Sequence, residues 1–290
     1  MKIYGLFLIS GLAVGSLYAL GGIGLVVLRR ATGVLNFAYG AIAAAAAMVC
    51  WQLAQWDFPG PAAWLSAIVT GTALSLLYGM IVAPGLAWRE PAVKAVATLG
   101  FALIILGAVS FLWDDAARKL VLPTDKMGVR LLGMKITVTR MIAFFGSLAI
   151  LLGAMLYLEK TRTGLHMRAL ADNRDHSALI GIPVFRVETA AWALSGALAG
   201  FTGLMFGDLV RLDPTVITFT VIPAIAAAVC GRLQSLPLTF AGGLAIGVCE
   251  AMLTLVKPLA PLRSMTPFLI AALVILWMQR KETLTFAREG

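Results

Sequence analysis

Glu250 is the ionisable residue best placed to do chemistry inside a membrane, because it stands mid-way along the apolar segment from Leu238 to Val256. A carboxylate at that depth is costly unless it is paired, protonated or in contact with water, so it indicates a transport pathway or a polar packing network. Lys257 follows two turns later on roughly the same helix face and can either pair with Glu250 or extend to the outer surface. One function that Glu250 allows is that of a self-sufficient secondary transporter or channel, in which the carboxylate couples protons or ions.

The remaining reactive side chains form no catalytic or metal-binding set. The two histidines both stand in one polar stretch, without an HExxH pattern or an apposed Ser and Asp, which argues against a hydrolase and a zinc site. The three cysteines are isolated in apolar segments and are interpreted as small buried hydrophobic residues. No GxxxxGK(S/T) motif occurs, so energy must come from another subunit or from a gradient. We therefore expect no enzymatic activity, no cofactor and no bound metal. The histidines and cysteines considered are His166, His176, Cys50, Cys230 and Cys249.

The elements that position these residues are membrane-spanning helices. The chain has 290 residues, of which 60% are hydrophobic and 13% charged, whereas soluble domains carry roughly 25% charged residues. Because a span needs about 20 apolar residues, this composition predicts an all-α, polytopic transmembrane bundle of about eight to nine spans that forms one domain over residues 1–290. The net charge of +9 comes from basic residues scattered at segment ends, which favours contact with the lipid bilayer over nucleic-acid binding.

Two longer polar stretches interrupt the expected spans. Residues 114–138 combine charges with short β-prone pieces, so a small hairpin around Gly133 or a packed loop is expected there, as an extracytoplasmic loop. Residues 159–186 are placed in the cytoplasm, on the same side as the paired Arg29 and Arg30. The predicted spans are residues 5–28, 38–56, 62–88 (kinked or ended by Pro84), 95–113, 141–158, 187–209, 216–230, 238–256 and 267–278, which puts the N-terminus outside.

Small residues recur at four-residue spacing in two of these spans, a pattern that lets helices approach each other closely. One set lies in the first span and the other in the span over residues 187–209. The residues expected at helix-packing contacts are Gly11, Gly15, Gly196, Gly200, Gly203 and Gly207.

A break between two apolar helices is predicted from Gly33 to Gly40. Its backbone groups can line a cavity, as discontinuous helices do at transport sites, or the segment can be a tight cytoplasmic turn, and the residue pattern favours neither. The candidates for lining a translocation path are Ser16, Asn36, Gly40, Thr98 and Glu250.

The polar stretch 159–186 can hold two short helices. Thr163 can cap the first, and Asp175 can cap the second, which Gly181 would close in a left-handed conformation. Pro183 then enforces a corner before the next span. The predicted result is an elbow parallel to the membrane whose compact outer surface fits a groove on a soluble partner, with an ordinary solvated loop as the alternative.

Four stretches of the chain resemble the permease subunits of branched-chain amino acid ABC importers. The longest is RALADNRDHSALIGIPVFRVETAAWALSGALAGFTGLMFG, which is similar to the signature region of that family. GLAVGSLYALGGIGLVVLRRATGVLNFAYG is similar to the opening of the H-type permease. TLGFALIILGA and AAAVCGRLQSLPLTFAGGLAIG match two further family stretches in the right order.

The resemblance implies an H-type permease subunit of an importer for branched-chain amino acids or a related small polar solute, in a bacterial inner membrane and working by alternating access. The implied partners are a second, M-type permease in a heterodimer, two ATP-binding subunits and an extracytoplasmic solute-binding protein. In such importers a cytoplasmic coupling segment sits in a cleft of the ATP-binding subunit and transmits the ATP-driven closure. The positions of this chain that match it are Arg168, Ala169, Ala178, Gly181 and Ile182.

The chain departs from the family pattern in CGRLQSLP, where Arg232 and Gln234 replace small residues, and in its C-terminus, which lacks the usual Arg-Pro-x-Gly-Leu ending. These differences bear on the solute and on the partner ATPase. A charged cluster at the outer end of the 187–209 span either docks the binding protein or is ordinary surface charge, and consists of Asp208, Arg211 and Asp213.

Overall fold

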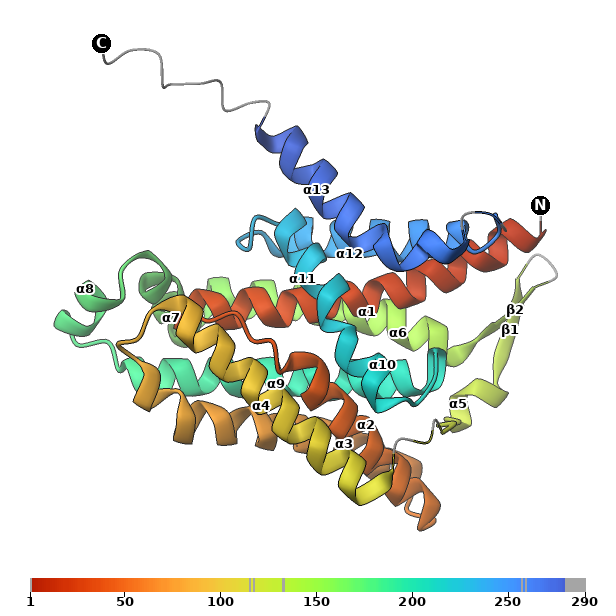
Figure 1. Cartoon of the computed structure of the whole chain (residues 1–290), viewed down its shortest axis with the longest axis horizontal. Coiled ribbons are helices and arrows are strands. Elements are labelled where there is room, and N and C mark those ends of the chain that lie inside the picture. Colours follow the sequence, from red (N-terminus) through yellow and green to blue (C-terminus); the bar gives the residue numbers. More distant parts are fainter. Residues whose placement is uncertain are drawn as a thin grey trace.

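The computed structural model describes residues 2–114, 116, 118–131, 134–256, 258 and 260–279, and most of this part of the chain is helical (Figure 1). The long helices are α1 (Lys2–Thr32), α2 (Tyr39–Gln55), α3 (Gly60–Leu77), α4 (Pro91–Trp113), α6 (Val138–Lys160), α9 (Val184–Leu209), α12 (Leu236–Leu253) and α13 (Thr266–Gln279). The shorter elements are η1 (Tyr78–Val82), η2 (Pro84–Leu86), α5 (Pro123–Lys126), β1 (Gly128–Leu131), β2 (Met134–Thr137), α7 (Arg162–Asp172), α8 (Arg174–Leu179), α10 (Pro214–Phe219), α11 (Val221–Cys230) and η3 (Ala260–Met265).

The long helices cross the molecule between two ends that carry the polar elements (Figure 1). Helices α7 and α8 lie at one end, where α1 stops and α9 starts, while the β1–β2 hairpin and the N-terminus lie at the other. The two strands pair antiparallel, with Gly128 opposite Thr137 and Leu131 opposite Met134. The predicted hairpin is therefore confirmed, although Gly133 itself lies outside the described residues.

Six helices of the described chain are long and apolar enough to cross a membrane, namely α1, α3 with η1, α4, α6, α9 and α12. Two shorter apolar stretches, Pro214–Cys230 and Leu262–Trp277, accompany them. This architecture is that of a multi-pass membrane protein, because a helix satisfies its own backbone hydrogen bonds in lipid. The predicted helical transmembrane bundle is confirmed, and the count of eight to nine spans stays a prediction.

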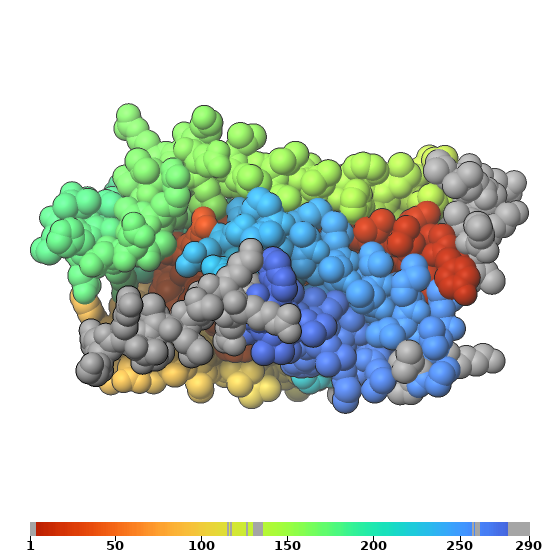
Figure 2. Space-filling view, turned by 90° about the horizontal axis from the view of Figure 1, so that it is seen from above, coloured from red at the N-terminus to blue at the C-terminus, as the bar shows by residue number. Residues whose placement is uncertain are grey.

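Helices α1 and α9 form the centre of the bundle. In their apolar stretches 89% and 72% of the residues are buried, against 22% in α4 and 28% in α6. The outer helices consequently present large apolar side chains to their surroundings, among them Leu103, Phe111 and Leu152, as a lipid-facing surface requires. Figure 2 shows α6 along one edge of the molecule, with α12 beside it, α13 on the other side of α12, and α1 visible only in short stretches.

Glycines allow these helices to touch backbone to backbone. A Cβ built on Gly11 or Gly15 would lie 2.8 Å from a carbonyl oxygen of α12. On α9, a Cβ at Gly196 or Gly200 would lie 2.4 Å or 2.3 Å from a carbonyl oxygen of α3, and one at Gly203 would lie 2.0 Å from a carbonyl of α2. Side chains at these positions would force the helices apart, so the small residues set the interhelical spacing.

Gly207 has looser surroundings than the other packing glycines. The nearest atoms to its Cβ position belong to the side chains of Leu120 and Leu212, both at 3.2 Å. At this end of α9 the closest contacts are therefore with the 118–122 segment and with the residues that follow α9, and α2 comes next, with the Ala47 Cβ atom at 3.7 Å.

The third predicted span, 62–88, is correct in place and ends just before Pro84, which is one of the two effects predicted for that proline. Regular α-helix stops at Leu77, and a π-helical turn follows, in which the Ala83 amide donates to the Tyr78 carbonyl at 3.0 Å. Pro84 lacks an amide hydrogen and its ring would collide with a carbonyl in the preceding turn, so the helix widens and then stops. Cys249 also differs from its prediction, because it is exposed whereas Cys50 and Cys230 are buried.

Candidate functional site

Two interrupted helices meet inside the bundle. The chain leaves α1 at Thr32, turns at Gly33 with φ +70°, and does not become helical again until Tyr39. The α10–α11 segment is interrupted near Thr220 and crosses the start of α2, where a Cβ on Gly40 would lie 2.0 Å from the Thr218 carbonyl oxygen. Interrupted helices expose backbone polar groups within a membrane only where protein or a water-filled path satisfies them.

Thr98 of α4 holds the extended part of this break. Its hydroxyl oxygen accepts a hydrogen bond from the Phe37 amide at 3.0 Å and lies 3.3 Å from the Leu35 carbonyl oxygen. Thr98 is completely buried. The hydroxyl hydrogen has its shorter contact with the Ala95 carbonyl of α4 itself, at 2.7 Å, so the backbone group that Thr98 satisfies in the break is the Phe37 amide.

Asn36 is buried at the centre of the break, with 1% of its surface exposed. Its side-chain oxygen accepts a hydrogen bond from the Ala38 amide at 3.0 Å, which closes a local turn just before α2. Its side-chain nitrogen Nδ2 has no hydrogen-bond partner among the described residues. A buried amide with free donor capacity is a polar point that water or a passing solute can satisfy.

Of the five path candidates, the structure brings Asn36, Gly40 and Thr98 together and places the other two elsewhere. The Ser16 hydroxyl is buried between α1 and α6, 3.2 Å from the Ala143 carbonyl oxygen, a contact that joins these two helices. Glu250 lies only one turn before the end of α12, so its predicted position in the middle of a span is wrong. Its carboxylate accepts a hydrogen bond from the Tyr18 hydroxyl at 2.9 Å. Lys257, its predicted partner, lies outside the described residues.

The polar stretch 159–186 forms an elbow of two short helices, α7 and α8, but their caps differ from the prediction by two residues. Thr161, rather than Thr163, caps α7 by accepting a hydrogen bond from the Gly164 amide at 3.0 Å. Asn173, rather than Asp175, caps α8 through the His176 amide at 2.9 Å. Both predicted caps come two residues too late and lie inside the first turn of their helices, whereas a cap must precede the first helical residue.

The end of α8 is closed as predicted. Gly181 has φ +85°, a left-handed conformation that favours glycine, and the Ile182 amide donates to the Ser177 carbonyl at 3.1 Å. Helix α9 then starts at Val184, directly after Pro183.

The elbow has a buried inner face and an exposed outer tip. Met167 and Leu170 of α7 are buried, and a Cβ on Gly164 would lie 2.4 Å from the Tyr157 carbonyl oxygen of α6, so α7 is seated firmly on the bundle. At the tip, Leu179 is 83% exposed and Ile180 is 71% exposed. Two adjacent apolar side chains in water at a polar end of the molecule indicate a contact surface.

The five predicted coupling residues all lie on this elbow, with differing exposure. Arg168, Ala178 and Gly181 are exposed, while Ala169 and Ile182 are partly buried. Sequence reasoning missed Leu179 and Ile180, although an apolar pair next to a left-handed glycine at the end of a polar helix was a usable signal.

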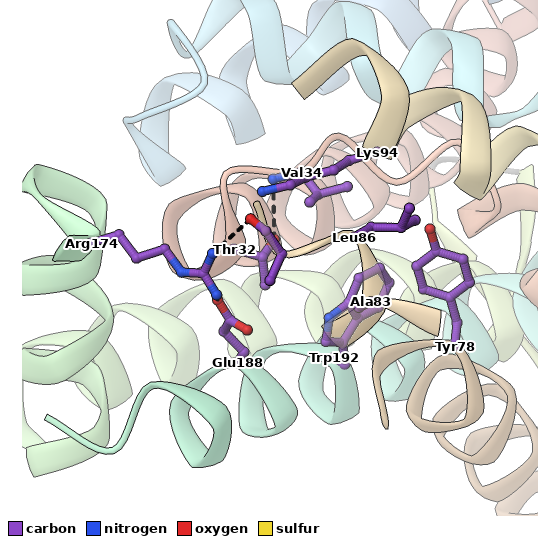
Figure 3. Close-up of a pocket in the computed structure, with 10 residues that line it drawn as sticks. Thr32, Val34, Tyr78, Ala83, Leu86, Lys94, Arg174, Glu188 and Trp192 are labelled. Atoms are coloured by element: carbon purple, nitrogen blue, oxygen red, sulfur yellow. Dashed lines mark hydrogen bonds and ion pairs between the residues drawn. The ribbon is translucent and has the colours of Figure 1, made fainter. Parts of the chain in front are cut away.

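Arg174 fixes the elbow to the bundle (Figure 3). Its guanidinium forms an ion pair with Glu188 of α9 at 2.8 Å and donates a hydrogen bond to the Ala87 carbonyl, just after η2, at 3.0 Å. It also lies 6.0 Å from the centre of the Trp88 ring. One side chain of α8 thus connects α9 with the turn between α3 and α4.

The space beside this ion pair is too small for a solute. Its volume is about 20 Å³, roughly one water molecule, and Figure 3 shows Lys94, Tyr78 and Trp192 around it. The Trp192 ring nitrogen is buried without a hydrogen-bond partner among the described residues. We interpret this region as a packed joint, and sequence reasoning missed it because the hydrogen bond from Arg174 to Ala87 joins residues 87 positions apart and leaves no local pattern.

The departure at CGRLQSLP coincides with unusual backbone geometry. Arg232 and Leu233 both have φ +56°, a region that glycine adopts more easily. The Gln234 carbonyl accepts a hydrogen bond from the Arg30 guanidinium at the end of α1. Small residues would adopt this turn readily, but here Arg232 and Leu233 form it. The hydrogen bond from Arg30 attaches the turn to α1.

The charged cluster after α9 has structural partners. Asp208 accepts a hydrogen bond from the Leu122 amide at 2.9 Å, which attaches the segment before β1 to the bundle. Asp213 caps α10 by accepting from the Thr215 and Val216 amides. These two carboxylates are therefore engaged within the chain itself.

Comparison with known proteins gives one consistent result. The profile of the family described as branched-chain amino acid transport system / permease component matches residues 7–278. A probable branched-chain amino acid transport permease protein LivH of Methanocaldococcus jannaschii is 28% identical over 241 residues, which is 80% of this chain and 75% of that protein. The high-affinity branched-chain amino acid transport system permease proteins BraD of Pseudomonas aeruginosa and LivH of Escherichia coli are 25% and 23% identical, each over 84% of this chain and over 84% and 83% of their own length.

Proposed function

This chain belongs to the family of permease components of branched-chain amino acid transport systems, and we propose that it is the H-type permease subunit of an ATP-binding-cassette importer. Its solute is a branched-chain amino acid or a related small polar molecule. It resides in the inner membrane of a bacterium and works by alternating access, in which the helices rock around a central path.

Other subunits supply what the chain lacks. The sequence contains no Walker A motif, so ATP is hydrolysed by two separate ATP-binding subunits. A second permease of the M type completes a heterodimer, and an extracytoplasmic solute-binding protein delivers the solute and does most of the choosing.

The elbow of α7 and α8 is the observation that carries this proposal. Its tip is apolar and exposed at Leu179 and Ile180, yet its base is fixed by buried α7 residues and by the Arg174–Glu188 ion pair. A surface that binds a partner and is rigidly attached to the bundle transmits a displacement to it, whereas a solvated loop would change its own conformation instead. The ATP-binding subunit would therefore grip the elbow and move it when ATP binds.

Substitution of Gly181 tests the coupling role. Nothing lies within 4 Å of a Cβ at Gly181, so Gly181→Trp adds bulk to the docking surface without a clash inside the chain. We expect the complex to insert normally and to retain basal ATP hydrolysis, but to lose ATP-driven leucine uptake in proteoliposomes. Gly181→Ala is the matched control, because it carries the same left-handed strain without the bulk. Equal uptake by the tryptophan variant and the wild type would rule out the coupling role.

The helix break forms the centre of the proposed path. Asn36, Gly40 and Thr98 meet where the break between α1 and α2 lies beside the interrupted α10–α11 segment, which is the arrangement that transporters use to place polar backbone at membrane depth. Ser16 and Glu250 stay predictions as path residues, since they lie away from this junction.

The hydrogen bond between Glu250 and Tyr18 keeps one rival function open, that of a secondary transporter or channel coupled through Glu250. Reconstitution of the purified chain alone in liposomes separates the two functions. The importer predicts no solute movement along an ion gradient without the other subunits. Gradient-driven transport that disappears in Glu250→Gln would establish the rival.

A further inference from the structure

A cavity of about 270 Å³ lies at the end of α12, between α12, α1 and η3, away from the helix break and from the elbow. Two charged side chains line it, Glu250 and Arg263, together with Tyr18, whose hydroxyl lies beside the Glu250 carboxylate. Three others are apolar: Phe7, Val14 and Val210. The cavity is slightly smaller than the roughly 300–1,000 Å³ of sites for drug-sized ligands, which suits a small solute.

The two charged groups face one cavity without neutralising each other. Glu250 accepts the Tyr18 hydroxyl at 2.9 Å, but Arg174–Glu188 is the one ion pair among the described residues, so Arg263 lies beyond ion-pair distance from Glu250. Both side chains nevertheless line the same cavity. A carboxylate and a guanidinium that share one cavity without forming an ion pair with each other can each take an oppositely charged group of a ligand.

The walls of the cavity are held in place by close helix packing. A Cβ on Gly11 would lie 2.8 Å from the Gly247 carbonyl oxygen, and one on Gly247 would lie 2.3 Å from the Gly15 Cα atom. Helices α1 and α12 therefore cannot slide freely past each other at the level of Tyr18 and Glu250. A site with fixed walls loses little freedom on binding, which favours recognition of a small ligand.

We propose that this cavity binds a zwitterionic aliphatic α-amino acid, an inference that rests on the proposed function and names a site for its solute. The ammonium group of the ligand contacts the Glu250 carboxylate, whose orientation Tyr18 fixes. The ligand carboxylate contacts Arg263, and the aliphatic side chain lies against Phe7, Val14 and Val210. Because η3 lies on the side of the N-terminus, the site is at the extracytoplasmic end of the bundle, where the solute would arrive.

Binding of three matched probes to the purified full-length chain in lipid nanodiscs tests this site. The probes are L-leucine, L-leucinamide, which lacks the carboxylate, and 2-hydroxy-4-methylpentanoate, which has a hydroxyl in place of the ammonium. Saturation-transfer NMR, corrected with empty nanodiscs, gives a Kd for each. With the wild type we expect each analogue to bind about tenfold or more weakly than leucine, as expected for loss of one charge-assisted hydrogen bond.

The variants should show a crossed pattern. Glu250→Gln should lower the affinity for leucine to that for the hydroxy acid and leave the hydroxy acid unchanged. Arg263→Gln should lower the affinity for leucine to that for leucinamide and leave leucinamide unchanged. Glu159→Gln, at the opposite end of the bundle, should bind all three probes as the wild type does. Misfolding would weaken all probes together and cannot produce the crossed pattern.

Three results would overturn the proposal: no discrimination among the probes by the wild type, equal loss of all three in a Glu250→Gln variant that elutes and melts as the wild type does, or unchanged preference in both variants. The proposed function is tested separately by ATP-driven leucine uptake with the complete complex. Uptake by a wild-type complex that shows no probe discrimination would remove this site and keep the importer. Absence of uptake would remove the importer, whatever the binding pattern.

Discussion

Replacement of Arg174 by methionine should weaken the attachment of the elbow to the bundle. Methionine keeps an unbranched apolar stem but removes the ion pair with Glu188 at 2.8 Å and the hydrogen bond to the Ala87 carbonyl at 3.0 Å. It also leaves the Glu188 carboxylate, whose side chain is 17% exposed, without its partner.

The expected size of this effect follows from the exposure of the pair. Exposed ion pairs contribute about 0–1 kcal/mol, whereas removal of one partner of a fully buried pair costs about 3–5 kcal/mol. With side chains 30% and 17% exposed, the Arg174–Glu188 pair lies between these limits. After a discount for solvent screening, we expect local opening of the elbow to become easier by about 2 kcal/mol, which is roughly a 30-fold change.

Amide hydrogen exchange reports this opening directly. The Gly181 and Ile182 amides donate to carbonyls of α8, so their exchange should become roughly 30-fold faster in Arg174→Met. Amides in the middle of α9 should be unchanged. Arg186→Met is the matched control, because Arg186 is exposed and makes no ion pair among the described residues.

A double-mutant cycle with Glu188→Gln identifies the cause. If the ion pair is the anchor, the two substitutions should not add, and their coupling should exceed about 1 kcal/mol. Exchange rates in Arg174→Met equal to those in the Arg186→Met control, or effects of the two substitutions that simply add, would refute the anchor.

Three further substitutions test the packing, the helix break and the tip of the elbow. Gly40→Ala should lower the stability of the purified chain by about 1–3 kcal/mol, because its Cβ would overlap a carbonyl oxygen of α10. Gly107→Ala is the control and should not lower the stability, because a Cβ there meets no atom within 4 Å. Equal melting temperatures of the two variants would contradict this packing. Thr98→Val should lower the stability by about 1–3 kcal/mol, because it leaves the buried Phe37 amide unpaired. Thr72→Val is the control, since Thr72 loses only a hydrogen bond within its own helix. A smaller loss of stability in Thr98→Val than in Thr72→Val would argue against the role of Thr98 in holding the helix break. Leu179→Glu should leave stability within about 0.5 kcal/mol, since its side chain is 83% exposed, yet prevent co-purification of the ATP-binding subunits; normal recovery of these subunits would remove the tip from the docking surface.

The sequence predicts the architecture well because hydrophobicity and small-residue spacing are local properties. The run of apolar residues ending at Arg29 and Arg30 predicts α1 to within a few residues of its observed end at Thr32. Pro84 predicts the end of the third span because a missing amide hydrogen acts within one turn. Gly181 is predicted to be left-handed and has φ +85°.

Contacts between distant residues are what the sequence does not predict. Arg174 and Glu188 are close to each other in the chain, but the hydrogen bond from Arg174 to Ala87 spans 87 residues and leaves no pattern of spacing. The clamp of Thr98 on Phe37 likewise joins residues 61 positions apart. Glu250 was misplaced for a different reason: a polar residue within an apolar segment carries no information on where the helix ends.

Helix α9 connects the elbow with the helix break, and its packing explains how a movement at one would reach the other. It starts directly after Pro183, holds Arg174 through Glu188 in its second turn, and touches α3 backbone to backbone at Gly196 and Gly200. Two residues further, the Thr202 hydroxyl is 3.0 Å from that of Tyr39, the first residue of α2 after the break. Because these contacts leave no space for a side chain, α9 cannot shift without moving α2 or opening a gap. A displacement of the elbow would therefore act on the start of α2, next to Asn36, whose side-chain nitrogen has no hydrogen-bond partner among the described residues. This mechanical link needs no change of charge along α9.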